Sequence, residues 1–124
     1  MRSTILLLLL VAACAGGRPI RPQSGGDQYL ILAEELRGAS QQANLYDAVR
    51  ELRPFWFTRH VRTGDQIAVY LDDQRVGSVN MLQRIPVTSA QAVRYLSPTE
   101  AQVRYGPNNQ MRPVIAIDTP RRSN

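Results

Sequence analysis

Residues 66–120 read QIAVYLDDQRVGSVNMLQRIPVTSAQAVRYLSPTEAQVRYGPNNQMRPVIAIDTP, and this stretch decides the fold. The runs Ile67–Leu71 and Val114–Ile117 are short, unbroken and apolar, which is typical of strands covered on both faces. Between them, Val93–Leu96 alternates apolar and polar side chains, which predicts a half-buried strand. The stretch therefore predicts a β-sheet whose strands are separated by turns and short helices.

The connections between these strands carry turn and helix signals. Asp72–Gln74 is polar and turn-like, and Val76-Gly77 could add a brief pairing at the sheet edge. Asn80–Ile85 offers one or two helical turns, which end at Pro86 because proline lacks an N–H donor.

A second helix is predicted by a capping box. Ser97 is its N-cap, Pro98 stands in its first turn, and Glu100 follows three residues after the cap. Gly106-Pro107 ends this helix.

The chain before this stretch adds a strand and two helices. Tyr29–Leu32 has strand length, and Ala33–Arg37 turns helical. In the next helix Asn44 is the N-cap, and Pro54 follows its end. Its apolar residues share the spacing of one buried face: Leu45, Ala48, Val49 and Leu52. Its charged residues are expected to face solvent: Asp47, Arg50, Glu51 and Arg53. These elements predict an α+β domain over residues 27–120, with a small mixed sheet of four strands and short helices packed on it.

Five segments of this domain carry a resemblance to a known family. They are Val69–Asp73, Leu82–Pro86, Ala92–Leu96, Glu100–Gly106 and Val114–Thr119. Their succession resembles the plug domain of TonB-dependent outer-membrane receptors. That family has an aspartate-glycine after a strand, an isoleucine-proline before a short helix, and a tyrosine-glycine before a last strand that runs into a threonine. The resemblance implies a plug-like fold.

The chain departs from the family pattern at two places. Asp73 or Gln74 stands where the family has its glycine, and Arg112-Pro113 replaces the glycine that enters the last strand. We expect the fold to tolerate both changes. Five residues follow Thr119, so we expect a stand-alone domain without a barrel of its own.

The first residues have the pattern of a targeting signal. Arg2 precedes the apolar run Ile5–Val11, which is far shorter than the roughly 20 residues that span a bilayer. The run ends in Val11-Ala12-Ala13-Cys14, which resembles the lipobox of bacterial lipoproteins. The resemblance implies removal of residues 1–13 and attachment of diacylglycerol and an acyl chain at Cys14. With Ala15 next, rather than an aspartate, it implies sorting to the outer membrane. The alternative is an ordinary signal peptide with an incidental cysteine.

Residues 14–26 are expected to form a lipidated, flexible tether, because they are rich in glycine and proline and poor in apolar side chains. Arg18 and Arg21 either contact anionic head groups or belong to a solvated spacer. The tail is residues 121–124. The 15 basic residues are all arginine and lie scattered among acidic ones. This pattern favours a coding bias over a selected arginine surface that binds phosphate or carboxylate groups.

An aromatic cluster leaves two interpretations open. Phe55, Trp56 and Phe57, flanked by Arg53 and Arg59, would suit a surface that binds a protein or glycan. Alternatively, the three rings cap the small core.

Residue types that carry enzyme chemistry are sparse. His60 is the single histidine, and Cys14 is the single cysteine, so neither a catalytic triad nor a metal site is predicted. The sequence has no glycine-rich phosphate loop and no dinucleotide fingerprint, so no cofactor is expected. A secretory signal also argues against nucleic acid as a partner.

We therefore expect a non-enzymatic, lipid-anchored module that faces the periplasm at the outer membrane and contacts another protein. The alternative is an accessory component of TonB-dependent transport that binds a ligand or docks to a separate outer-membrane barrel. A lipoprotein enzyme is a third, less favoured hypothesis.

Overall fold

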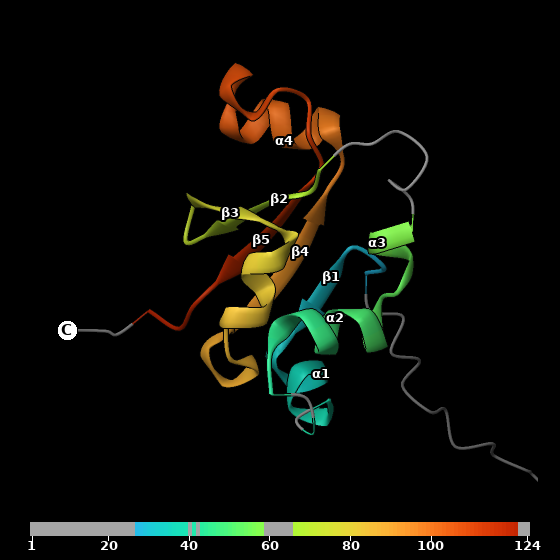
Figure 1. Cartoon of the computed structure of the whole chain (residues 1–124). Helices are drawn as coiled ribbons and strands as arrows, with labels where there is room; N and C mark the ends of the chain where they lie inside the picture. The colour runs from blue at the N-terminus through green and yellow to red at the C-terminus, as the bar shows by residue number, and fades with distance from the viewer. Residues whose placement is uncertain (1–26, 40, 42, 59–65, 122–124) are drawn as a thin grey trace, which may run out of the picture.

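A computed structural model describes residues 27–39, 41, 43–58 and 66–121 (Figure 1). The predicted signal peptide, Cys14, the tether, Arg59 and His60 lie outside these residues. The domain is α+β, as predicted. Its sheet has the strand order β1-β4-β5-β2-β3. The strands are β1 (Leu30–Leu32), β2 (Ala68–Leu71), β3 (Gln74–Ser78), β4 (Ala92–Leu96) and β5 (Val114–Asp118).

The sheet has five strands, so the prediction of four was wrong. The additional strand is β3, where only a brief edge pairing was expected at Val76-Gly77. β3 forms a hairpin with β2, and its pairing runs from Leu71↔Gln74 to Ala68↔Ser78 with one irregularity. The sequence of this strand is mostly polar, because β3 lies at the edge of the sheet and its residues are exposed or half-buried.

β2 and β5 form the centre of the sheet and pair in parallel, with Val69 opposite Ile115. The other three pairings are antiparallel, so the sheet is mixed. Both central strands are buried nearly throughout, which explains their unbroken apolar sequences.

Successive side chains along each strand point to opposite faces of the sheet, and each face carries a hydrophobic core. One face carries the main core, which includes Val69, Val93, Tyr95, Ile115 and Ile117. This face is covered by α1 (Ala33–Gly38), α2 (Leu45–Leu52) and α3 (Phe55–Thr58). It is also covered by the 3₁₀ helices η1 (Val79–Arg84) and η2 (Val87–Ser89). The opposite face carries a smaller core under α4 (Pro98–Tyr105), which η3 (Pro107–Asn109) follows.

The predicted helix caps are confirmed. The side chain of Asn44 accepts a hydrogen bond from the backbone N–H of Asp47, at 3.0 Å. The capping box at Ser97 and Glu100 is complete, and Pro98 occupies the first turn. Both signals act within four residues, which is why the sequence alone identifies them. No helix among the described residues has the length and apolarity to cross a bilayer.

Ile115 offers a test of the parallel pair, because its side chain is fully buried on β5. Replacing it with alanine should lower the free energy of unfolding by about 2–5 kcal/mol through lost burial and a cavity. Urea melts of the chain without residues 1–13 and with Cys14→Ser measure this loss. Val103→Ala is the control, since Val103 is 85% exposed and should change stability little. A loss below about 0.5 kcal/mol for Ile115→Ala would contradict the assigned core.

Candidate functional site

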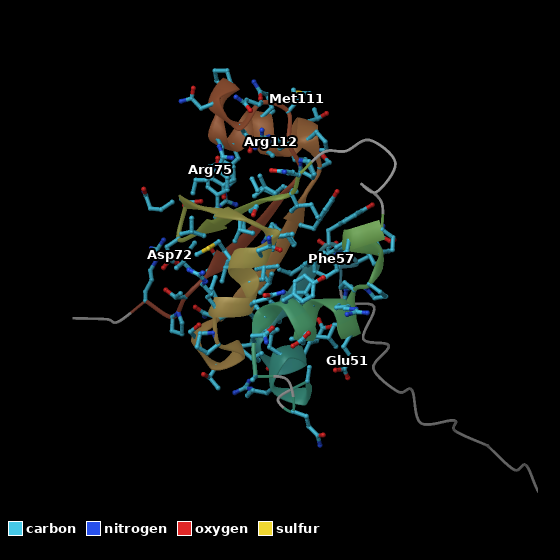
Figure 2. All side chains as sticks on the ribbon, in the orientation of Figure 1. Glu51, Phe57, Asp72, Arg75, Met111 and Arg112 are labelled. Carbon is cyan, nitrogen blue, oxygen red and sulfur yellow. The ribbon has the colours of Figure 1, made fainter. Side chains whose placement is uncertain are left out.

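A polar recess lies where the parallel strands β2 and β5 both end. Its volume is about 950 Å³. It is lined by Asp72, Asp73, Gln91, Arg104, Asp118, Thr119 and Arg121. Parallel strands bring their carboxyl ends to the same edge of the sheet, so residues from distant parts of the chain meet here. Asp72 is labelled beside this end of the sheet in Figure 2.

Asp72 and Asp73 form the two-residue turn between β2 and β3. Both have positive φ, 46° and 64°, a conformation that aspartate tolerates better than most residues. The carboxylate of Asp72 accepts hydrogen bonds from the backbone N–H of Thr119 at 2.9 Å and from its hydroxyl at 2.6 Å. The turn is therefore joined to the end of β5, 47 residues further along the chain.

Asp73 joins the same turn to α4. Its Oδ1 accepts hydrogen bonds from Nη2 of Arg104 at 2.8 Å, from Nε of Arg104 at 3.2 Å and from the hydroxyl of Tyr105 at 3.1 Å. The ring of Tyr105 stacks on Tyr70, with centroids 3.9 Å apart. Adjacent carboxylates thus hold two different elements in place.

These contacts set the charge of the recess. The hydrogen bonds from Thr119 lower the pKa of Asp72, and the hydrogen bond from Arg104 lowers the pKa of Asp73. Burial raises the pKa of Tyr105 to about 12, and the hydrogen bond to Asp73 raises the pKa of Arg104. At neutral pH both carboxylates are ionised, the guanidinium is charged and the phenol is neutral. None of these four groups is tuned to exchange a proton near neutral pH.

Asp118 and Arg121 also line the recess. Within the described part of the chain neither side chain makes a hydrogen bond or ion pair, but the charge of Arg121 helps to lower the pKa of Asp72 and Asp73, and that of Asp118 helps to raise the pKa of Arg104. A smaller apolar recess of about 280 Å³ shares Gln91 with the polar one. The arrangement is suited to binding a charged group beside an apolar one. Over the residues that the structure covers, no cluster of three or more His, Cys, Asp or Glu side chains could hold a metal ion.

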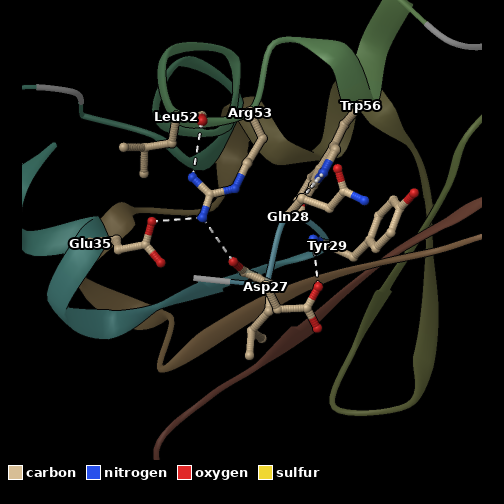
Figure 3. A network of polar contacts seen from close by, with 8 residues as sticks. Asp27, Gln28, Tyr29, Glu35, Leu52, Arg53 and Trp56 are labelled. Carbon is tan, nitrogen blue, oxygen red and sulfur yellow. Dashed lines mark hydrogen bonds and ion pairs between the residues drawn. The ribbon is translucent and has the colours of Figure 1, made fainter. Parts of the chain in front are cut away.

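The aromatic cluster of the sequence lies elsewhere, on the main-core face. Trp56 is fully buried, and its Nε1 donates a hydrogen bond to the carbonyl of Gln28 at 2.9 Å (Figure 3). Phe55 and Phe57 are half-buried, and Phe57 packs its ring 5.1 Å from that of Tyr46. The structure thus favours the core-capping interpretation for these rings.

Arg53 was expected to face solvent, and this prediction was wrong. Its guanidinium forms an ion pair with Glu35 at 2.8 Å and donates to the carbonyls of Leu30 at 3.1 Å and Leu52 at 3.0 Å (Figure 3). Only 14% of its side chain is exposed. Arg53 turns inward because the partners that draw it lie on β1 and α1, and helical periodicity carries no information about them.

The sequence predicted only a turn at Asp72 and Asp73. In the structure the two carboxylates point to different partners, so each forms its own set of hydrogen bonds. The signal that could have identified the contacts is the resemblance, because Thr119 and Tyr105 both belong to its motifs. Comparison of this chain with known protein families, curated proteins and solved structures gave no match.

The lowered pKa values of Asp72 and Asp73 predict that the folded domain loses stability in acid. Their pKa values are lower in the folded than in the unfolded chain, so the unfolded state binds more protons as pH falls. The stability that they contribute is present above the unfolded pKa near 4 and is lost as pH falls through the folded pKa. Urea melts from about pH 6 to about pH 2.5 measure this loss.

The matched variant is Asp72→Asn with Asp73→Asn, because asparagine also tolerates positive φ. It should be less stable than the parent at neutral pH and should lose less stability on acidification. Equal acid dependence in parent and variant would show that these carboxylates are not linked to folding.

Proposed function

We propose that this protein is a lipid-anchored, non-enzymatic interaction module at the outer membrane, where a plug-like domain faces the periplasm and contacts another protein. The observation that carries the proposal is the sequence Val11-Ala12-Ala13-Cys14 after a short apolar run, with Cys14 the single cysteine of the chain. Each lipid methylene that enters a bilayer contributes about 0.8 kcal/mol, so several acyl chains would hold the domain at the membrane.

The plug-like character is supported by contacts between the segments that carry the resemblance. The turn at Asp72 binds Thr119 of the last motif, and Asp73 binds Tyr105 of the tyrosine-glycine motif. Motif residues that stabilise one another support a shared fold better than spacing alone.

A second candidate is an accessory role in TonB-dependent transport, with a bound ligand or a separate barrel as partner. The polar recess favours it, because Asp118 and Arg121 line it, form no ion pair with the other described residues and could bind a charged group. The first proposal has the stronger support, since both sheet faces are already covered by the chain's own helices.

The anchor can be tested at Cys14. Cys14→Ser should abolish labelling by a palmitate analogue and release the protein from membranes, because the sulfur is the expected attachment point. Ala15→Asp is the matched variant, which should keep the label and move the protein to the inner-membrane fraction. An unlabelled Cys14→Ser protein that stayed in the membrane would refute the anchor.

The two candidates differ in what the domain needs in order to fold. We expect residues 27–124 alone to unfold cooperatively on heating, since the two cores are built from the chain itself. Circular dichroism and calorimetry of this fragment measure the transition. A fragment that becomes ordered only when a barrel protein is co-expressed would favour the transport role.

A further inference from the structure

We propose that the outer edge of β3 binds an extended segment of the partner protein as a sixth strand, and that this segment alternates acidic and apolar side chains. The inference deepens the proposed function, because it rests on the protein being an interaction module and names the surface and the partner's chemistry. Strand addition of this kind obtains affinity from backbone hydrogen bonds and specificity from alternate side chains.

The two edges of the sheet differ in how their backbone groups are satisfied. At the β1 edge, the carbonyl of Tyr29 accepts from the N–H of Tyr95, so the carbonyls of Gln28 and Leu30 point away from β4. Both outward carbonyls are capped by side chains. Nε1 of Trp56 donates to Gln28 at 2.9 Å, and Nη2 of Arg53 donates to Leu30 at 3.1 Å (Figure 3). This edge is closed to another strand.

The β3 edge carries no such cover in the described part of the chain. β3 is the last strand of the sheet, and its residues Gln74–Ser78 are exposed or half-buried. β3 spans five residues, about 17 Å of backbone when fully extended. Its regular part precedes Gly77, which has a φ of 148° and follows the shift in pairing with β2. Unpaired edge groups of this length are a template for strand pairing.

The start of β3 is held rigid before any partner arrives. The turn at Asp72 is bound to Thr119, and Asp73 is bound to Arg104. An edge that is already fixed loses little conformational entropy on binding, so a larger share of each new hydrogen bond contributes to affinity.

The side chains of β3 define what the sixth strand should carry. Arg75 lies opposite Tyr70, whose ring belongs to the small core, so Arg75 stands on the α4 side of the sheet (Figure 2). It is exposed and makes no ion pair within the described residues. Val76 packs against the main core on the other face. A sixth strand that places an acidic side chain beside Arg75 and apolar side chains on the face of Val76 would match the side chains of β3 on both faces of the sheet.

A second copy of the chain fits this edge less well. Antiparallel self-pairing centred on Arg75 would place the two guanidinium groups opposite each other, and like charges directly opposite destabilise a strand pair. The irregular pairing between Val69 and Tyr70 and the charge of Arg75 both disfavour purely apolar strands. Because Arg75 makes no ion pair within the described residues, it favours a partner strand that places an acidic side chain opposite it.

The test uses the full lipoprotein extracted in detergent and a fluorescent peptide of about six residues that alternates Glu and Val. Fluorescence anisotropy should show saturable binding of this peptide and none of its Lys-Val counterpart. Methylation of alternate peptide nitrogens should abolish binding, because it removes the N–H donors that pair with an edge. Amide hydrogen exchange should slow at Gln74–Ser78 and not at β1.

Arg75→Glu should lower the affinity for the Glu-Val peptide by about fivefold or more and allow the Lys-Val peptide to bind. Arg50→Glu is the control, since Arg50 is exposed on α2, which covers the main-core face, whereas Arg75 stands on the α4 side of the sheet. This variant should leave both affinities unchanged. Circular dichroism establishes that both variants remain folded.

Equal binding of the two peptides, binding of the methylated peptide, or protection away from Gln74–Ser78 would overturn the proposal. Self-association that buries the same amides would replace the heterologous partner with a second copy. These outcomes are separate from the anchor test, because a lipoprotein that fractionates with the outer membrane but ignores the peptide refutes only the edge assignment. A Cys14→Ser protein that binds the peptide but was never lipidated refutes only the anchor.

Discussion

The parallel pairing of β2 with β5 is the constraint on which the other features depend. Two strands separated by more than 40 residues of chain must run side by side, so the chain between them has to cross from one end of the sheet to the other. That chain supplies β3 and β4 at the sheet and α4 over one face. Because the central strands are apolar on both sides, both faces need a cover, and α1, α2 and α3 provide the second one. The two cores follow from this single pairing.

The same pairing determines where charged residues gather. β2 ends at the acidic turn and β5 ends at Asp118 and Thr119, and parallel direction places both ends at one edge. Backbone and side-chain donors there hold Asp72 and Asp73 ionised. The turn therefore connects the β2–β3 hairpin to β5 and α4 through hydrogen bonds. The hydrogen bonds of the recess hold its charges in position. The raised pKa values of Arg104 and Tyr105 keep the guanidinium charged and the phenol neutral at physiological pH.

The two edges of the sheet differ in whether side chains cap their outward backbone groups. The edge nearest the N-terminal segment is closed by Arg53 and Trp56, whose side chains take up the outward carbonyls of β1. The opposite edge is held firmly at its turn and left with an arginine on its surface.

Interactions that act over three or four residues were determined by the sequence alone. The caps at Asn44 and Ser97, the apolar central strands and the α+β class are all decided by neighbours along the chain or by average burial. Tertiary structure decided the rest. β3 is a strand because the β2 edge pairs with it, although its own side chains are polar. Trp56 and Arg53 turn inward because carbonyls more than 20 residues away need donors. Asp72 and Asp73 connect distant elements only because folding brings Thr119 and Arg104 within hydrogen-bond distance of them. Local spacing contains no information on such distant partners, because their positions are set by the packing of the whole sheet.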